Sequence, residues 1–86
     1  MKNLIKNYIE KLNVDKLKQF SLDNNINLSN IELEYILKLV KENLEDILKD
    51  DTKYLKLLEN NINQTEFIKI KELYLYYKNK YKMYLF

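Results

Sequence analysis

Apolar residues recur three or four positions apart in five stretches of the chain, and this spacing places each set on one face of a helix. The first stretch spans residues 3–12, and the second runs to about residue 23. The third carries the longest apolar stripe: Leu33, Ile36, Leu37, Val40, Leu44, Ile47 and Leu48. Tyr54, Leu55 and Leu58 mark the fourth, and the fifth runs nearly to the C-terminus. Because nothing alternates long enough for a strand, we predict an all-α fold, a compact bundle of about five helices in a single domain, residues 1–86.

The helix boundaries must be set by Asn, Asp, Ser and Thr, because the chain has no Gly or Pro. Asn13 or Asp15 can cap the second helix. Ser29 and Glu32 have the spacing of a capping box, in which each side chain bonds the other residue's amide, so the third helix should begin there. We expect Thr65 to start the fifth helix.

One segment of the sequence echoes another 36 residues later. Leu-Asp-Asn-Asn-Ile-Asn-Leu-Ser, residues 22–29, returns as Leu-Glu-Asn-Asn-Ile-Asn-Gln-Thr, residues 58–65. Each copy has the residues of a helix end, a short turn and a helix N-cap. Two interpretations remain open: an Asn-rich chain repeats a favoured loop, or the protein consists of two helix-loop-helix units packed as a pair.

Paired helix-loop-helix units also occur in EF-hand calcium proteins. Framed from Ser21, the first loop places Asp23, Asn25 and Glu32 at the third, fifth and twelfth positions of such a motif. Ile26, however, takes the place of the glycine that the sharp turn needs, and Ser21 takes the place of the first carboxylate. We therefore predict a capped loop and no metal site.

The composition removes the side chains on which most catalytic centres depend. The chain contains no Gly, Pro, Ala, Arg, His, Cys or Trp, which excludes thiolate nucleophiles, Cys/His metal sites and glycine-rich phosphate loops. Its carboxylates fall mostly at surface spacing among lysines. We expect no enzyme, no catalytic residues, no cofactor and no small-molecule substrate. The favoured amino acids have A/T-rich codons, which indicates an AT-rich genome.

Charge and hydropathy indicate a cytoplasmic protein. The chain lacks cysteine, has no apolar stretch of membrane-spanning length, and its first residues are too polar for a signal peptide.

The net charge of +2 is unevenly distributed. Residues 1–20 and 69–86 are basic, whereas residues 21–68 carry ten acids against five lysines. Such bipolarity can steer a partner or be satisfied within the molecule.

The C-terminal segment has the strongest functional signal. Residues 69–86 hold five Lys and five Tyr along one predicted helix, which has apolar residues on two faces. A helix that is apolar on two sides needs two surfaces to pack against, and tyrosine is frequent at interfaces. We therefore predict a protein-protein interaction module, with a second copy or a different protein as partner. The predicted partner-binding residues are Ile68, Leu75, Tyr76, Lys78, Lys80, Lys82, Met83 and Phe86.

Nucleic-acid binding is the alternative use of the same helix. Lys78, Lys80 and Lys82 would contact phosphates while exposed tyrosines stack on unpaired bases. The absence of arginine and the acidic middle of the chain argue against it.

The segment from Leu17 to Val40, with its Asn-Ile-Asn-Leu-Ser turn at residues 25–29, resembles a family of short uncharacterised all-helical proteins of Bacillus-type low-GC bacteria. Larger residues replace the alanines that this family would place on its packing faces. The resemblance implies a small, cytoplasmic, all-helical bacterial protein, and it carries over no catalytic residues. A short phage-encoded inhibitor protein would have a similar composition.

Overall fold

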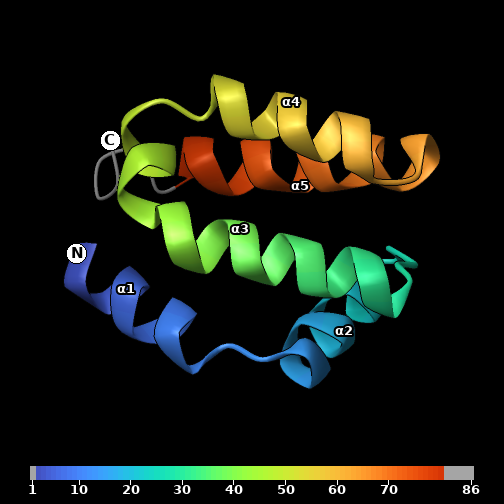
Figure 1. The fold of residues 1–86 in the computed structure, drawn as a ribbon, viewed down its shortest axis with the longest axis horizontal. Coiled ribbons are helices and arrows are strands. Elements are labelled where there is room, and N and C mark those ends of the chain that lie inside the picture. The colour runs from blue at the N-terminus through green and yellow to red at the C-terminus, as the bar shows by residue number, and fades with distance from the viewer. Residues whose placement is uncertain (1, 81–86) are drawn as a thin grey trace.

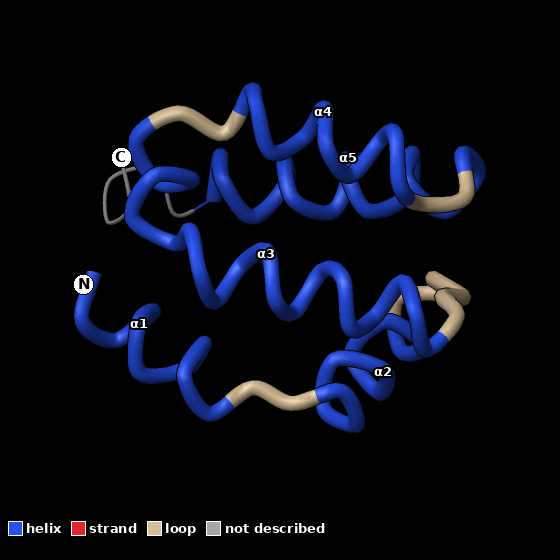
Figure 2. The backbone as a smooth tube through the Cα atoms, viewed as in Figure 1, coloured by secondary structure: helices blue, strands red, loops and turns tan. Residues whose placement is uncertain are grey.

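The computed structural model describes residues 2–80, and within this range the chain forms helices and no strand. The five helices follow one another through short loops (Figure 2). Their bounds are α1 Lys2–Lys11, α2 Val14–Asp23, α3 Asn30–Lys49, α4 Thr52–Asn61 and α5 Gln64–Lys80. The predicted all-α fold is confirmed.

The long helix α3 organises the bundle. In Figure 1 it lies between α1 and α2 on one side and the pair of α4 and α5 on the other. α1 and α2 each pack on α3, and α4 packs on both α3 and α5. The radius of gyration, 12.3 Å, is close to the value of about 12 Å for a compact domain of this length. The chain therefore forms a compact bundle around one central helix.

The best-packed part of the interior lies between α3, α4 and α5. Leu58, Ile62 and Phe67 form a buried cluster, against which the half-buried side chains of Tyr35 and Ile36 pack. Leu33 of α3 has no exposed surface. The buried apolar side chains of the described residues are few, however, and the side of the bundle that holds α1 and α2 adds only Leu12 and Ile26 to them.

The observed helix starts test the predicted capping residues. The Asn13 side chain accepts a hydrogen bond from the Lys16 amide, 2.8 Å, and so caps α2. Ser29 and Glu32 form the predicted capping box at the start of α3. The fifth helix begins earlier than the sequence suggested. Asn63 Oδ1 accepts from the amides of Thr65 and Glu66, so Asn63 takes the capping role because asparagine is at least as good an N-cap as threonine.

The two copies of the echo segment lie next to each other. Each buries its central isoleucine, Ile26 in the first copy and Ile62 in the second. Glu32 joins the two loops: one carboxylate oxygen accepts from the Ser29 amide, 2.9 Å, and the other accepts from the Asn63 amide, 2.7 Å. The helix caps differ between the copies, since Ser29 caps α3 and Asn63 caps α5. The two loops therefore share the buried isoleucine but not the position of the cap.

Helix α3 is bent at Asn43, whose φ of −129° and ψ of 20° are not helical. The Asn43 side chain donates to the carbonyl of Leu39, 2.9 Å, which takes an acceptor out of the helix ladder. The bend was not predicted, because the apolar residues of α3 keep their helical spacing on both sides of Asn43.

Candidate binding surface on the fifth helix

Helix α5 is anchored by one carboxylate from the loop between α3 and α4. Asp51 Oδ2 accepts from the Tyr74 hydroxyl, 2.7 Å, and from Lys78 Nζ, 2.8 Å. Burial works against the charge of Asp51, but the hydrogen bonds from Lys78 and Tyr74 outweigh it and lower the pKa of this carboxyl. Burial and the hydrogen bond to Asp51 raise the pKa of the Tyr74 phenol. These contacts fix which side of α5 faces inward.

The outward side of α5 carries apolar residues that the described part of the chain leaves partly exposed. Ile68 is 49% exposed, Leu75 is 38% exposed and Tyr76 is 58% exposed. Ile68 and Leu75 are seven residues apart, so they lie two turns apart on the same face. The opposite face of the helix is already occupied, because Phe67 is buried in the core. Three of the residues predicted to bind a partner are therefore exposed on α5.

Tyr76 also belongs to a row of aromatic rings between α5 and α2. The rings of Tyr76 and Tyr77 meet edge to face with centroids 5.3 Å apart, and Tyr77 lies 6.5 Å from the ring of Phe20. Both distances fall in the range of favourable aromatic pairs. Lys80 Nζ lies 5.8 Å from the centre of the Tyr76 ring, which is within cation-π range. Lys80 thus extends the aromatic row with a positive charge.

The remaining predicted partner-binding residues have different positions. Lys78 bonds Asp51 at the inner seam of α5, so its charge is engaged within the protein. Lys82, Met83 and Phe86 lie outside the described residues. The predicted residues that the structure leaves exposed on α5 are therefore Ile68, Leu75, Tyr76 and Lys80, which we call the outer face of α5.

An apolar groove between α5 and the α1–α2 side was not predicted from the sequence. It encloses about 370 Å³. Its floor is α3 and its walls come from α1, α2 and α5, with only aliphatic or aromatic lining residues: Tyr8, Ile9, Leu12, Leu17, Phe20, Ile36, Leu37, Val40, Ile70, Leu73, Tyr74 and Tyr77. These side chains belong to the helical stripes of the sequence. The stripes predicted their inward direction, but only the tertiary arrangement shows that a space remains between them.

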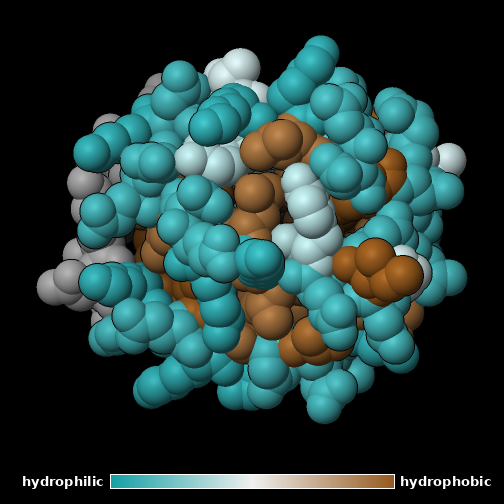
Figure 3. Space-filling model, viewed as in Figure 1, coloured by the Kyte–Doolittle hydropathy of each residue, from teal (hydrophilic) through white to brown (hydrophobic). Residues whose placement is uncertain are grey.

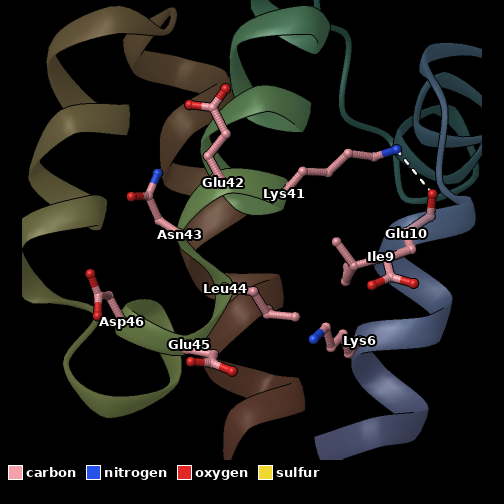
Figure 4. Close-up of a pocket in the computed structure, with 9 residues that line it drawn as sticks. All are labelled: Lys6, Ile9, Glu10, Lys41, Glu42, Asn43, Leu44, Glu45 and Asp46. Atoms are coloured by element: carbon pink, nitrogen blue, oxygen red, sulfur yellow. Dashed lines mark hydrogen bonds between the residues drawn. The ribbon is translucent and has the colours of Figure 1, made fainter.

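A second hollow is polar and lies between α1 and the bend of α3 (Figure 4). It measures about 460 Å³. Lys41 Nζ closes one end by donating to the backbone carbonyl of Glu10, 3.2 Å. In Figure 4 Leu44 and Ile9 point toward each other, whereas Asn43 and Asp46 point to the other side of α3. The carboxylates therefore do not converge on a common point.

Chemistry other than binding has little support on this surface. Among residues 2–80 no group of three or more Asp or Glu side chains is placed to hold a metal ion. Asp23 accepts a hydrogen bond from Gln19, and Glu32 accepts from two backbone amides, so neither carboxylate is directed into a calcium loop.

Figure 3 shows one face of the molecule, where apolar side chains gather in the middle within a hydrophilic border. None of the described helices combines the length and apolar character that crossing a membrane requires.

No protein-family model, curated protein or solved structure matches the chain.

Proposed function

We propose that the protein is a small interaction module that binds another protein through the outer face of α5 and performs no catalysis. The observation that carries the proposal is the exposure of Ile68, Leu75 and Tyr76 on a helix whose other side is already packed. Isolated exposed apolar residues are common on proteins, but several of them on the outward side of one helix favour a binding surface. A cytoplasmic setting belongs to the same proposal, since the chain has no cysteine.

The chemistry of this face favours a partner with an apolar helix or strand. Ile68 and Leu75 offer aliphatic surface, and Tyr76 offers a large ring with a hydroxyl that can remain in water. An interface centred on one helix face is small, so the complex should be a weak or transient one unless neighbouring surfaces join it. A second copy of the chain and a different protein are both partners of this kind.

Nucleic-acid binding remains the weaker use of this helix. Lys78 would have to leave Asp51 before it could contact a phosphate, and this exchange would leave a partly buried carboxylate without its ion pair.

The proposal predicts that Ile68→Asp combined with Leu75→Asp abolishes association. The matched control is Ile31→Asp, because Ile31 is 80% exposed on α3, outside the outer face of α5. Light scattering over a range of protein concentrations measures self-association, and calorimetry with a purified partner measures the affinity for a different protein. We expect the double variant to be monomeric in light scattering or to bind a different protein at least tenfold more weakly, with an unchanged helical circular dichroism spectrum, since two charges would be buried in an apolar contact.

Equal association by the parent chain, the double variant and the Ile31→Asp control would contradict the assignment of this face. A parent chain that stays monomeric at every concentration would leave a different protein as the partner, and the same two variants would then be compared against that protein.

A further inference from the structure

A third hollow lies between α4 and α5 and measures about 430 Å³. Leu55 and Phe67 supply its apolar lining. Three of its lining residues are exposed lysines, two from α4 and one from α5: Lys53, Lys56 and Lys71. Glu59 is the one acid in the lining, so the hollow has a surplus of positive charge. We call it the basic hollow.

The contacts that these lysines make within the protein are weak. Lys71 has no hydrogen bond or ion pair with the described part of the chain. Lys53 Nζ lies 5.6 Å from the centre of the Tyr54 ring, and Lys56 Nζ lies 3.9 Å from a Glu59 carboxylate oxygen. Cation-π contacts and ion pairs at exposed positions contribute little to stability. A negatively charged partner could therefore recruit these lysines at small cost.

Lys71 joins the basic hollow to the apolar part of the outer face of α5. It follows Ile68 by three residues and precedes Leu75 by four, so it lies one helical turn from each. Successive residues of an α-helix are rotated by about 100°, which places Lys71 and Glu72 on opposite flanks of the line from Ile68 to Leu75. Lys71 is on the flank next to α4, because it lines the hollow. A partner on Ile68 and Leu75 thus meets positive charge on the α4 side and one negative charge on the other.

We propose that the partner of the outer face of α5 is an acidic amphipathic helix, an inference that rests on the proposed function. Its apolar side contacts Ile68 and Leu75, and Asp or Glu side chains on one flank reach Lys53 and Lys71. Burial of the apolar side supplies most of the affinity, and the lysines select the charge and the direction of the bound helix. A nucleic acid would match the lysines but would leave Ile68 and Leu75 without an apolar contact.

The probe is a capped helical peptide of about 18 residues, long enough to hold a helix, with leucines along one face and glutamates on one flank of that face. Two matched peptides carry glutamine or lysine in place of the glutamates. Fluorescence anisotropy of the labelled peptides measures their affinities. We expect the acidic peptide to bind in a 1:1 complex about tenfold more tightly than the glutamine peptide, and the lysine peptide to bind most weakly. High salt should reduce these differences, because exposed charges are screened.

Lys53→Glu combined with Lys71→Glu should weaken binding of the acidic peptide about tenfold and leave the affinity of the glutamine peptide unchanged. The control with the same change in net charge is Lys16→Glu with Lys18→Glu. Both residues are exposed on α2, which lies on the other side of α3 from α4 and α5 (Figure 1). An unchanged helical circular dichroism spectrum shows that each variant is folded.

Three results would overturn the acidic helix as the partner. They are equal affinities of the acidic, glutamine and lysine peptides, equal effects of the two lysine double variants on the acidic peptide, and binding of a single-stranded oligonucleotide by a chain that does not bind the acidic peptide. A homodimer that Ile68→Asp with Leu75→Asp dissociates would instead assign the face to a second copy of the chain.

The same peptides separate this inference from the proposed function. Equal binding of all three peptides that Ile68→Asp with Leu75→Asp abolishes would retain the outer face of α5 as a binding surface and remove only the preference for an acidic partner. Binding of the acidic peptide that Lys53→Glu with Lys71→Glu weakens, but that Ile68→Asp with Leu75→Asp leaves unchanged, would contradict the proposed function.

Discussion

Asp51 holds α5 in place through two donors on that helix. Tyr74 and Lys78 lie one turn apart on α5 and both donate to the same carboxylate oxygen. A hydrogen bond to a charged, partly buried group contributes more than a neutral one, about 1.5–3 kcal/mol. Asp51 therefore couples the loop before α4 to the C-terminal half of α5, and it decides which tyrosines of α5 face inward.

Tyr74→Phe should lower the free energy of unfolding by about 1.5 kcal/mol, because it removes the hydroxyl donor and leaves the ring in place. Tyr76→Phe is the matched control on the same helix, and its effect should stay below about 0.5 kcal/mol because Tyr76 is largely exposed. Urea unfolding followed by circular dichroism measures both. Equal effects of the two substitutions would show that the bond to Asp51 does not stabilise the fold.

The pKa of Tyr74 is raised by burial and by its bond to Asp51, so its phenol favours the neutral form in the folded protein. A raised tyrosine pKa contributes stability that is present below the ordinary tyrosine pKa, about 10, and is lost as the pH rises through the folded value. The alkaline side of the stability curve should therefore be less steep in Tyr74→Phe.

Helix starts in this protein depend on single polar side chains, because no Gly or Pro is present to mark the boundaries. The pattern predicted the cap of α3 correctly, at Ser29, and of the two candidates that it offered for α2, Asn13 and Asp15, Asn13 is the cap. The pattern placed the start of α5 at Thr65, one residue after the observed start at Gln64, because both Asn63 and Thr65 are acceptable caps and the sequence does not rank them. In the structure the Asn63 side chain accepts from the amides of Thr65 and Glu66, so Asn63 is the cap.

Asn63→Ala should destabilise the protein by about 1 kcal/mol, because the amides of Thr65 and Glu66 lose their acceptor. Thr65→Ala, inside the first turn of α5, should cost less than about 0.5 kcal/mol. Thermal unfolding of the two single variants against the parent chain tests this order. A larger loss of stability in Thr65→Ala than in Asn63→Ala would indicate that Thr65 is the N-cap, as expected from the sequence.

Across the whole molecule, the two helix-loop-helix units are joined by charged side chains that act on backbone atoms. Glu32 accepts from the amide of Asn63, and Lys69 donates to the carbonyl of Asn25, 3.1 Å. The first contact links the start of α3 to the loop before α5, and the second links α5 to the loop before α3. The echo in the sequence suggested such a pairing, and the structure places the two loops side by side.

Acid should weaken this link. Hydrogen bonds from the amides of Asn63 and Ser29 lower the pKa of Glu32 below its ordinary value of 4.5. The contribution of Glu32 to stability is therefore present above about pH 4.5 and is lost as the pH falls through the lowered pKa. We expect Glu32→Gln to lower the free energy of unfolding by about 1 kcal/mol at neutral pH, with no difference from the parent chain once Glu32 is protonated.

Urea unfolding at a series of pH values measures the difference between Glu32→Gln and the parent chain. Glu34→Gln, an exposed site on the same helix, is the control and should follow the parent chain throughout. A Glu32→Gln difference that is independent of pH would mean that side-chain shape matters at this position and charge does not.

Local sequence information determined the secondary structure of this protein. The stripes predicted five helices, and the caps of α2 and α3 were recognisable, because both features depend on residues within one or two turns of each other. The exposure of Ile68, Leu75 and Tyr76 also followed from the second apolar face of the predicted helix. Tertiary packing decided the rest. The engagement of Lys78 by Asp51, the apolar groove and the junction of the two echo loops each depend on distances between helices, which intrahelical spacing does not encode.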